Sequence, residues 1–136
     1  MAAFVMTNAS VSIAGTDLSD HVKSVTIDAS VNLVDDTAMG DVFQSNAAGL
    51  ASWSISMELF QDYASSKTDA VLSQLMDIGD TVALVIKPVA ASVTSTNPSY
   101  SCTGILESYN PIAGTVGDQA MASVSFASAS VLTRNT

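Results

Sequence analysis

The side chains that most often carry out catalysis are few in this chain of 136 residues. His21 is the single histidine, and it stands between Asp20 and Val22 in a polar segment. A Ser-His-Asp arrangement would need a serine beside this histidine, but no Gly-x-Ser-x-Gly sequence marks one. We therefore expect His21 to be a solvated turn residue. A hydrolase built on β-strands is the least favoured class of function, and we expect the protein not to be an enzyme.

The sequence gives no stronger indication of metal or phosphate binding than of catalysis. Asp35, Asp36 and Asp41 could attract calcium, but they lack the spaced ligands of a calcium-binding loop. Adjacent residues in extended chain point to opposite faces, so Asp35 and Asp36 form a poor catalytic pair. Residues 114–117 contain two glycines but do not match a phosphate-binding loop. We expect no metal site and no cofactor.

The charge balance excludes several partners. Thirteen acidic residues stand against four basic ones, for a net charge of −9. Phosphate binding depends on Lys and Arg, so this chain is unsuited to grip nucleic acid or an anionic membrane surface. A surface that nucleic acid passes without sticking is compatible with the sequence. Residues 1–62 hold eight of the acids and only Lys23 among the bases, although solubility alone would also explain that excess.

Cysteine content and hydropathy suggest a compartment. Cys102 is the only cysteine, so no internal disulfide can form, and we expect it to be a small buried hydrophobic residue. No charged-then-apolar segment opens the chain, and no apolar run approaches the ~18 residues of a membrane span. We expect the protein to be made in a reducing cytoplasm, without a signal peptide.

Strict alternation of apolar and polar residues predicts strands. Between residues 50 and 59, apolar side chains at every second position face one way, while three serines and Glu58 face the other. The same pattern predicts a strand over residues 23–34 whose polar face is wet. Further strands are expected at residues 10–13, 81–87, 100–109 and 120–126.

One segment has helical spacing instead. Residues 66–78 place Val71, Leu75 and Ile78 on one stripe, and Gly79 supplies the stop. The near-continuous apolar run of residues 81–87 is typical of a strand covered on both faces, and we expect this helix to cover it.

Residues 35–49 form the longest segment without a predicted element. Connections of this length are uncommon and are usually functional or disordered. The segment contains Met39, Val42 and Phe43, so we expect it to contact a partner. The alternative is that Phe43 packs beneath its own domain.

These elements predict a single mainly-β domain over residues 1–136. The expected fold is an antiparallel β-sandwich or barrel with one flanking α-helix and a long inter-strand loop. Gly104 interrupts the strand at residues 100–109, where we expect a β-bulge.

The order of elements also carries a family resemblance. It rests on the strand at 23–34, the loop through Gly40-Asp41-Val42-Phe43 to Gly49-Leu50, the strand at 52–59, Phe60-Gln61-Asp62-Tyr63, the helix, the strand ending at Pro88, Ser95-Thr96-Asn97-Pro98-Ser99-Tyr100, Gly104 and Tyr109-Asn110-Pro111. In these features, residues 8–134 resemble a major tail tube protein of a long-tailed, non-contractile (siphovirus-type) bacteriophage. The resemblance contains no catalytic motif.

The resemblance implies a structural virion protein. Members of this family are β-sandwiches that form hexameric rings, and the rings stack into a tail tube with a continuous inner β-barrel. The implied partners are other copies of the chain, the tape measure protein, the tail terminator and the baseplate or distal tail proteins. Double-stranded DNA would pass through an acidic lumen without specific binding. The implied location is the tail of the virion, after assembly in the host cytoplasm.

Two sets of residues fit these roles. The wet faces of the two long strands would line the lumen, and repeated around a ring they would repel phosphate; they comprise Thr26, Asp28, Ser30, Ser54, Ser56 and Glu58. The apolar residues Met39, Val42 and Phe43 would contact the adjacent ring, and such a heterologous contact propagates a stack. Alternative functions are a capsid decoration or adhesin-type binding module, a tail terminator and the inner tube protein of a contractile tail.

Overall fold

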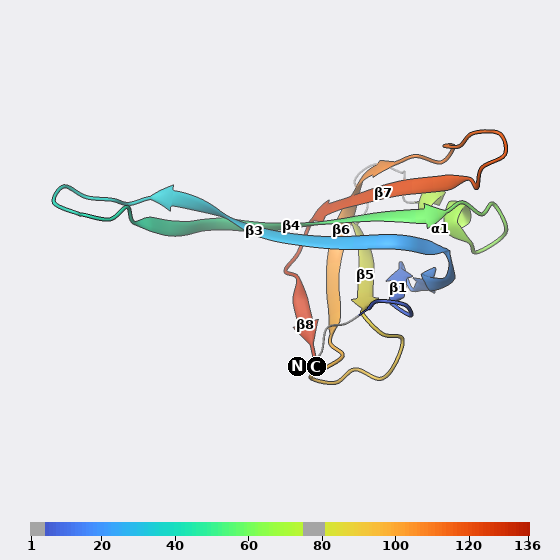
Figure 1. Ribbon diagram of the computed structural model, residues 1–136, viewed down its shortest axis with the longest axis horizontal. Coiled ribbons are helices and arrows are strands. Elements are labelled where there is room, and N and C mark those ends of the chain that lie inside the picture. The colour runs from blue at the N-terminus through green and yellow to red at the C-terminus, as the bar shows by residue number, and fades with distance from the viewer. Residues whose placement is uncertain (1–4, 75–80) are drawn as a thin grey trace.

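The computed structural model describes residues 5–74 and 81–136, and antiparallel strands dominate these segments (Figure 1). The strands are β1 (Ser10–Ile13), β2 (Thr16–Asp17), β3 (Val22–Asp35), β4 (Asn46–Phe60), β5 (Thr81–Lys87), β6 (Ser99–Tyr109), β7 (Met121–Ser128) and β8 (Thr133–Asn135). A short 3-10 helix, η1 (Ser19–His21), precedes β3, and the α-helix α1 (Thr68–Gln74) follows β4. The predicted mainly-β fold with one flanking α-helix is confirmed for the described residues.

One hydrogen-bonded path joins seven strands in the order β2-β1-β5-β6-β7-β4-β3, and β8 pairs with β6. The long strand β6 belongs to two layers, because its first half pairs with β5 and its second half with β7. β3, β4 and β7 run along the long axis of the molecule, whereas β5 and β6 cross it steeply (Figure 1). The two layers therefore face each other across a core, as in sandwiches whose strands turn a corner.

Side chains from both layers meet in this core. β1, β5, β7 and the second half of β4 bury every second residue, as a period of two requires. The predicted inward residues of β4, from Trp53 to Leu59, are all buried, and Cys102 is buried as expected. The core also contains Val11, Ile13, Leu18, Leu72, Val82, Leu84, Ile86, Tyr109, Ala122, Val124 and Phe126.

The predicted double cover of β5 is wrong. Val82 is buried, but on the other face Val85 is 37% exposed. The helix α1 lies instead at the end of β4 (Figure 1), where the Thr68 hydroxyl donates to the carbonyl oxygen of Phe60. Sequence spacing predicts this helix over residues 66–78. The structure starts it at Thr68, and the predicted stop at Gly79 lies outside the described residues.

The predicted loop at residues 35–49 is shorter in the structure, because β3 extends to Asp35 and β4 begins at Asn46. Only residues 36–45 connect the two strands. The sequence pattern breaks because β4 contains a bulge, where Gly49 and Leu50 lie opposite Asn32 and shift the alternation by one residue. A Cβ atom at residue 49 would lie 2.8 Å from the carbonyl oxygen of Asn32, so only glycine fits there.

The outer part of this hairpin projects beyond the body of the molecule, and we call residues 31–51 the hairpin arm (Figure 1). β7 pairs with β4 only from Ser54 onward, and within the described residues the outer edge of β3 has no partner strand. The arm is therefore a two-stranded ribbon, and such ribbons are marginally stable in water unless another surface covers them.

Candidate functional site

The six polar residues of β3 and β4 that were predicted to face solvent lie together on one exposed surface of the sheet. In the β3–β4 register, Thr26 lies opposite Ser56, Asp28 opposite Ser54, and Ser30 opposite Ser52. All are exposed, and they lie on the face opposite the core because the buried residues of β4 occupy the alternate positions. Glu58 completes the row opposite Ser24. We call this surface the polar face.

The polar face extends beyond the residues that sequence alternation groups together. Ser123 of β7 lies opposite Glu58, and Ser125 lies opposite both Ser56 of β4 and Ser108 of β6. These serines line a shallow groove together with Ser24 and Thr26. Alternation in residues 121–126 marks Ser123 and Ser125 as outward, but only the register shows that they join the same surface. Four strands thus present hydroxyl groups side by side.

Asp28 and Glu58 give this surface its charge. Within the described residues, neither carboxylate forms a salt bridge or accepts a hydrogen bond from a side chain. Their negative charges therefore lie uncompensated among small hydroxyl side chains. Such a surface has no cationic group to hold a phosphate.

The tip of the hairpin arm carries the three apolar residues that were predicted to contact a partner. Met39, Val42 and Phe43 are 104%, 91% and 85% exposed, so Phe43 does not pack beneath its own domain. The tip is nevertheless ordered by its own hydrogen bonds, since Asp41 accepts one from the backbone of Ala38 at 2.8 Å. An exposed apolar cluster on an ordered turn is typical of an interaction site.

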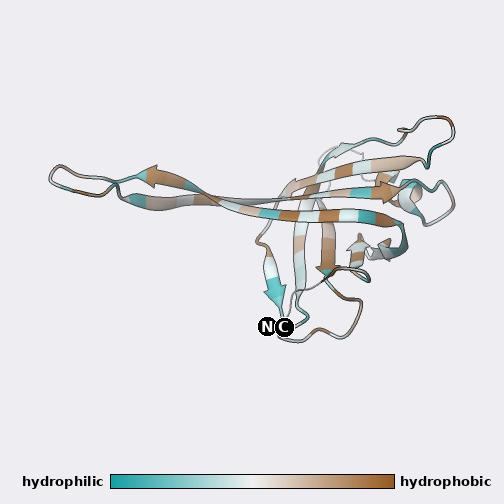
Figure 2. Cartoon of the chain, viewed as in Figure 1, coloured by the Kyte–Doolittle hydropathy of each residue, from teal (hydrophilic) through white to brown (hydrophobic). Residues whose placement is uncertain are grey.

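Other exposed apolar residues lie along the arm, in the two predicted strands that flank the predicted loop. Val31 is 43% exposed, Leu33 is 60% exposed, and Leu50 is 88% exposed. Brown, hydrophobic segments accordingly run along the projecting ribbon in Figure 2. The whole arm, and not only its tip, offers apolar surface.

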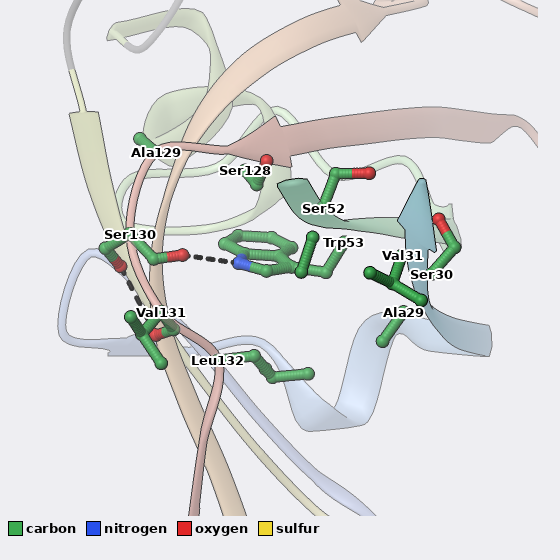
Figure 3. Close-up of a pocket in the computed structure, with 11 residues that line it drawn as sticks. Ala29, Ser30, Val31, Ser52, Trp53, Ser128, Ala129, Ser130, Val131 and Leu132 are labelled. Carbon is green, nitrogen blue, oxygen red and sulfur yellow. Dashed lines mark hydrogen bonds between the residues drawn. The ribbon is translucent and has the colours of Figure 1, made fainter. Parts of the chain in front are cut away.

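An apolar groove lies where the arm meets the body (Figure 3). Its walls come from β3, β4 and the connection between β7 and β8, and Trp53 forms its floor. The indole N–H of Trp53 donates to the carbonyl oxygen of Ser130 at 2.6 Å, which fixes that connection against the body. No local sequence pattern indicates this groove, because its walls are far apart along the chain.

His21 is more constrained than a solvated turn residue. Its two ring nitrogens lie 2.7 Å from Asp20 and 2.9 Å from Asp62, and its side chain is only 15% exposed. The hydrogen bond to Asp20, opposed by partial burial, leads the causes that raise the pKa of His21. The expected role in a solvated turn is therefore wrong: His21 ties η1 to the segment after β4.

The remaining candidates for chemistry in the described residues are a metal cluster and the Cys102 thiol. The described residues contain no group of three or more His, Cys, Asp or Glu side chains that could hold a metal ion. Burial raises the pKa of the Cys102 thiol to about 11, so it is a poor nucleophile. Within residues 5–74 and 81–136, no helix has the length and apolar character needed to cross a membrane.

Fold and surface together define a mainly-β protein with a projecting hairpin and an acidic polar face. Comparison with solved structures finds this fold in the tail of an empty gene transfer agent particle, determined by helical refinement with C6 symmetry. The match has a TM-score of 0.71 and 18% sequence identity, and it covers 85% of this chain and 83% of the other. A chain from the virion of a native gene transfer agent particle matches with a TM-score of 0.70 and 18% identity, covering 85% of both chains. No protein-family model and no curated protein matches the sequence.

Proposed function

We propose that this protein is the major tail tube subunit of a phage-like virion, and that it assembles into stacked hexameric rings around a DNA channel. The observation that carries the proposal is a fold shared over 85% of the chain with a protein from a tail of C6 symmetry. At 18% identity the likeness concerns the fold, so the role rests also on the surfaces described above.

The sheet has the edges that a ring needs. The layer bearing the polar face has the order β6-β7-β4-β3, and among residues 5–74 and 81–136 the pairing of β5 with β6 extends to Ile105 and no strand covers the same edge beyond it. The outer edges of β3 and of β6 from Leu106 to Tyr109 can therefore each accept a strand. Because neighbouring strands in this four-stranded layer are antiparallel, β3 of one copy would run antiparallel to β6 of the next. Closing a ring in this way also removes exposed strand edges, which otherwise promote uncontrolled association.

The polar face fits the lumen of such a ring. A sixfold ring would repeat Asp28 and Glu58 around the bore, among serine and threonine hydroxyls. Negative charge repels DNA phosphates, whereas lysine or arginine would hold DNA through release of counterions. Double-stranded DNA would therefore slide through without specific binding, which agrees with the net charge of −9.

The hairpin arm fits a contact between rings. It projects along the long axis of the molecule and exposes Met39, Val42 and Phe43 at its tip. Packing against an adjacent ring would cover this apolar surface and stabilise the two-stranded ribbon. The tape measure protein, the tail terminator and the distal tail proteins would be its further partners in the virion tail.

Size-exclusion chromatography followed by electron microscopy at several protein concentrations tests this proposal. We expect rings or hollow tubes, with the tube fraction rising with concentration. The experiment is repeated with nucleating tail components added, because the subunit alone is not required to start a tube. A strictly monomeric protein under both conditions would contradict the proposal and favour a binding module.

A further inference from the structure

The apolar groove at the base of the hairpin arm has a volume of about 810 Å³ and an uncharged lining. Trp53, at its floor, is 6% exposed, whereas Val31 and Val131 on its rims are 43% and 80% exposed. None of its eleven lining residues is ionisable, in a chain that contains thirteen acids. A segment that fills this groove must itself be uncharged, because burying an unpaired carboxylate is costly.

The connection between β6 and β7 has the matching character. Residues 110–117 contain no charged side chain, and they expose Ile112 at 86% and Val116 at 103%. The tip of the hairpin arm is a poorer match for the groove, because Asp41 lies between its apolar residues Met39 and Val42, whereas Asp118 stands beyond the end of residues 110–117.

This connection is also held in place before any partner binds. Tyr63 donates its hydroxyl to the carbonyl oxygen of Pro111 at 2.8 Å. The backbone N–H of Asn110 donates to Ser123 at 3.0 Å, and that of Met121 donates to Ala113 at 3.2 Å. A pre-ordered segment loses little conformational freedom on docking, so more of its apolar contact energy contributes to binding.

The two surfaces lie at opposite ends of the molecule. Figure 1 shows the β6–β7 connection at the end away from the arm, while the groove lies in the angle between the arm and the β7–β8 connection. A second copy displaced along the long axis would bring its β6–β7 connection toward this angle. Such a contact joins two different surfaces, so it repeats from copy to copy and does not close on itself.

We propose that residues 110–117 of one copy dock into the apolar groove of a copy in the adjacent ring, with Val116 and Ile112 contacting Trp53, Val31 and Val131. The contact rests on the proposed tail tube function and names a second site of stacking, separate from the tip of the arm. It makes the groove and the β6–β7 connection the two complementary halves of one ring-to-ring interface.

Cysteine cross-linking tests the contact. One preparation carries Val116→Cys, a second carries Val131→Cys, and the two are mixed, assembled and treated with a short bismaleimide. We expect covalent dimers in the mixture only, and a ladder of covalent oligomers from the double variant. Val93→Cys replaces Val131→Cys in the matched control, because Val93 is 38% exposed but lies outside the groove. Cys102 contributes little background because it is buried.

A charge variant gives an independent readout. Val116→Asp should raise the protein concentration needed for tubes by at least about tenfold, since it places a carboxylate in an apolar contact. Val93→Asp should leave that concentration unchanged, and far-UV circular dichroism checks that both variants fold.

Electron microscopy of the same samples separates the two hypotheses. Tubes that give no Val116–Val131 cross-link, and that form normally with Val116→Asp, would overturn the contact while leaving the tail tube function standing. Failure of the unmodified protein to assemble, even with nucleating tail components, would overturn the tail tube function and the contact with it.

Discussion

Trp53 and Gly104 pack so closely that a side chain on residue 104 would meet the indole ring. The Cη2 atom of Trp53 lies 3.0 Å from the position that a Cβ atom of residue 104 would occupy, and the carbonyl oxygen of Ala127 is equally near. The predicted bulge at Gly104 is wrong, because the register shift in β6 falls between Leu106 and Ser108. The glycine at residue 104 instead allows Trp53 to pack closely against β6.

Gly104→Ala should therefore destabilise the fold. The added methyl group must displace Trp53 or the β7 backbone, and overpacking of this kind costs typically about 1–3 kcal/mol. Urea unfolding followed by circular dichroism measures the change in the free energy of unfolding. Gly114→Ala is the matched control, because its nearest neighbour would be Ala120 at an ordinary 3.6 Å. Equal stability of the two variants would contradict this account of Gly104.

Stability should depend on pH through His21. Because the folded state raises the pKa of His21, its contribution is fully present below the unfolded value of about 6.5 and is lost as the pH rises through the folded value. Folding lowers the pKa of Asp20 and of Asp62, so their contributions are lost as the pH falls through their folded values. We expect the cluster to stabilise the fold most in mildly acidic solution.

His21→Gln tests this dependence. The variant should lose the decrease in stability that the wild type shows as the pH rises past neutrality, measured by urea unfolding at a series of pH values. His21 is the only histidine, so no second imidazole obscures the comparison. An unchanged pH profile in the variant would show that the contacts with Asp20 and Asp62 do not contribute to stability.

Reversing the charges of the polar face should convert a passive bore into a binding surface. In the double variant Asp28→Lys and Glu58→Lys, we expect tubes to form but DNA ejection to be hindered. The variant tubes should retain double-stranded DNA, and the retention should fall steeply with added salt because bound phosphates release counterions. Ser92→Lys adds positive charge at an exposed position of the connection between β5 and β6, outside the polar face, the groove and the arm, and serves as the control. Unimpaired ejection with the double variant would place the lumen on another face.

Truncating the tip of the hairpin arm should affect assembly more than folding. Phe43 is 85% exposed, so Phe43→Ala should change the free energy of unfolding by no more than about 0.5 kcal/mol. Loss of a buried aromatic contact between rings should raise the concentration needed for tubes by about tenfold or more. Val93→Ala provides the control. Tubes of normal length at normal concentrations would show that the tip does not join rings.

Local pattern is sufficient for most of the strands and for the composition of their faces. The period of two is a property of the extended backbone, so alternation alone places Trp53 and Glu58 on opposite faces of β4. The polar residues of β3 and β4 group correctly for the same reason. The bulge at Gly49 and Leu50 interrupts the alternation, and residues 46–49 of β4 therefore have the sequence pattern of a loop.

The sequence by itself determined the strand content, the alternation of faces, the single buried cysteine and the acidic balance, because each depends on a residue and its near neighbours. Only the tertiary structure decided which faces join. It aligned Ser125 with Ser56 and Ser108, brought His21 to Asp62 across 41 residues, left one side of β5 uncovered, and closed the groove over Trp53. These relationships depend on strand register and on packing between segments far apart in the chain, which local periodicity does not encode.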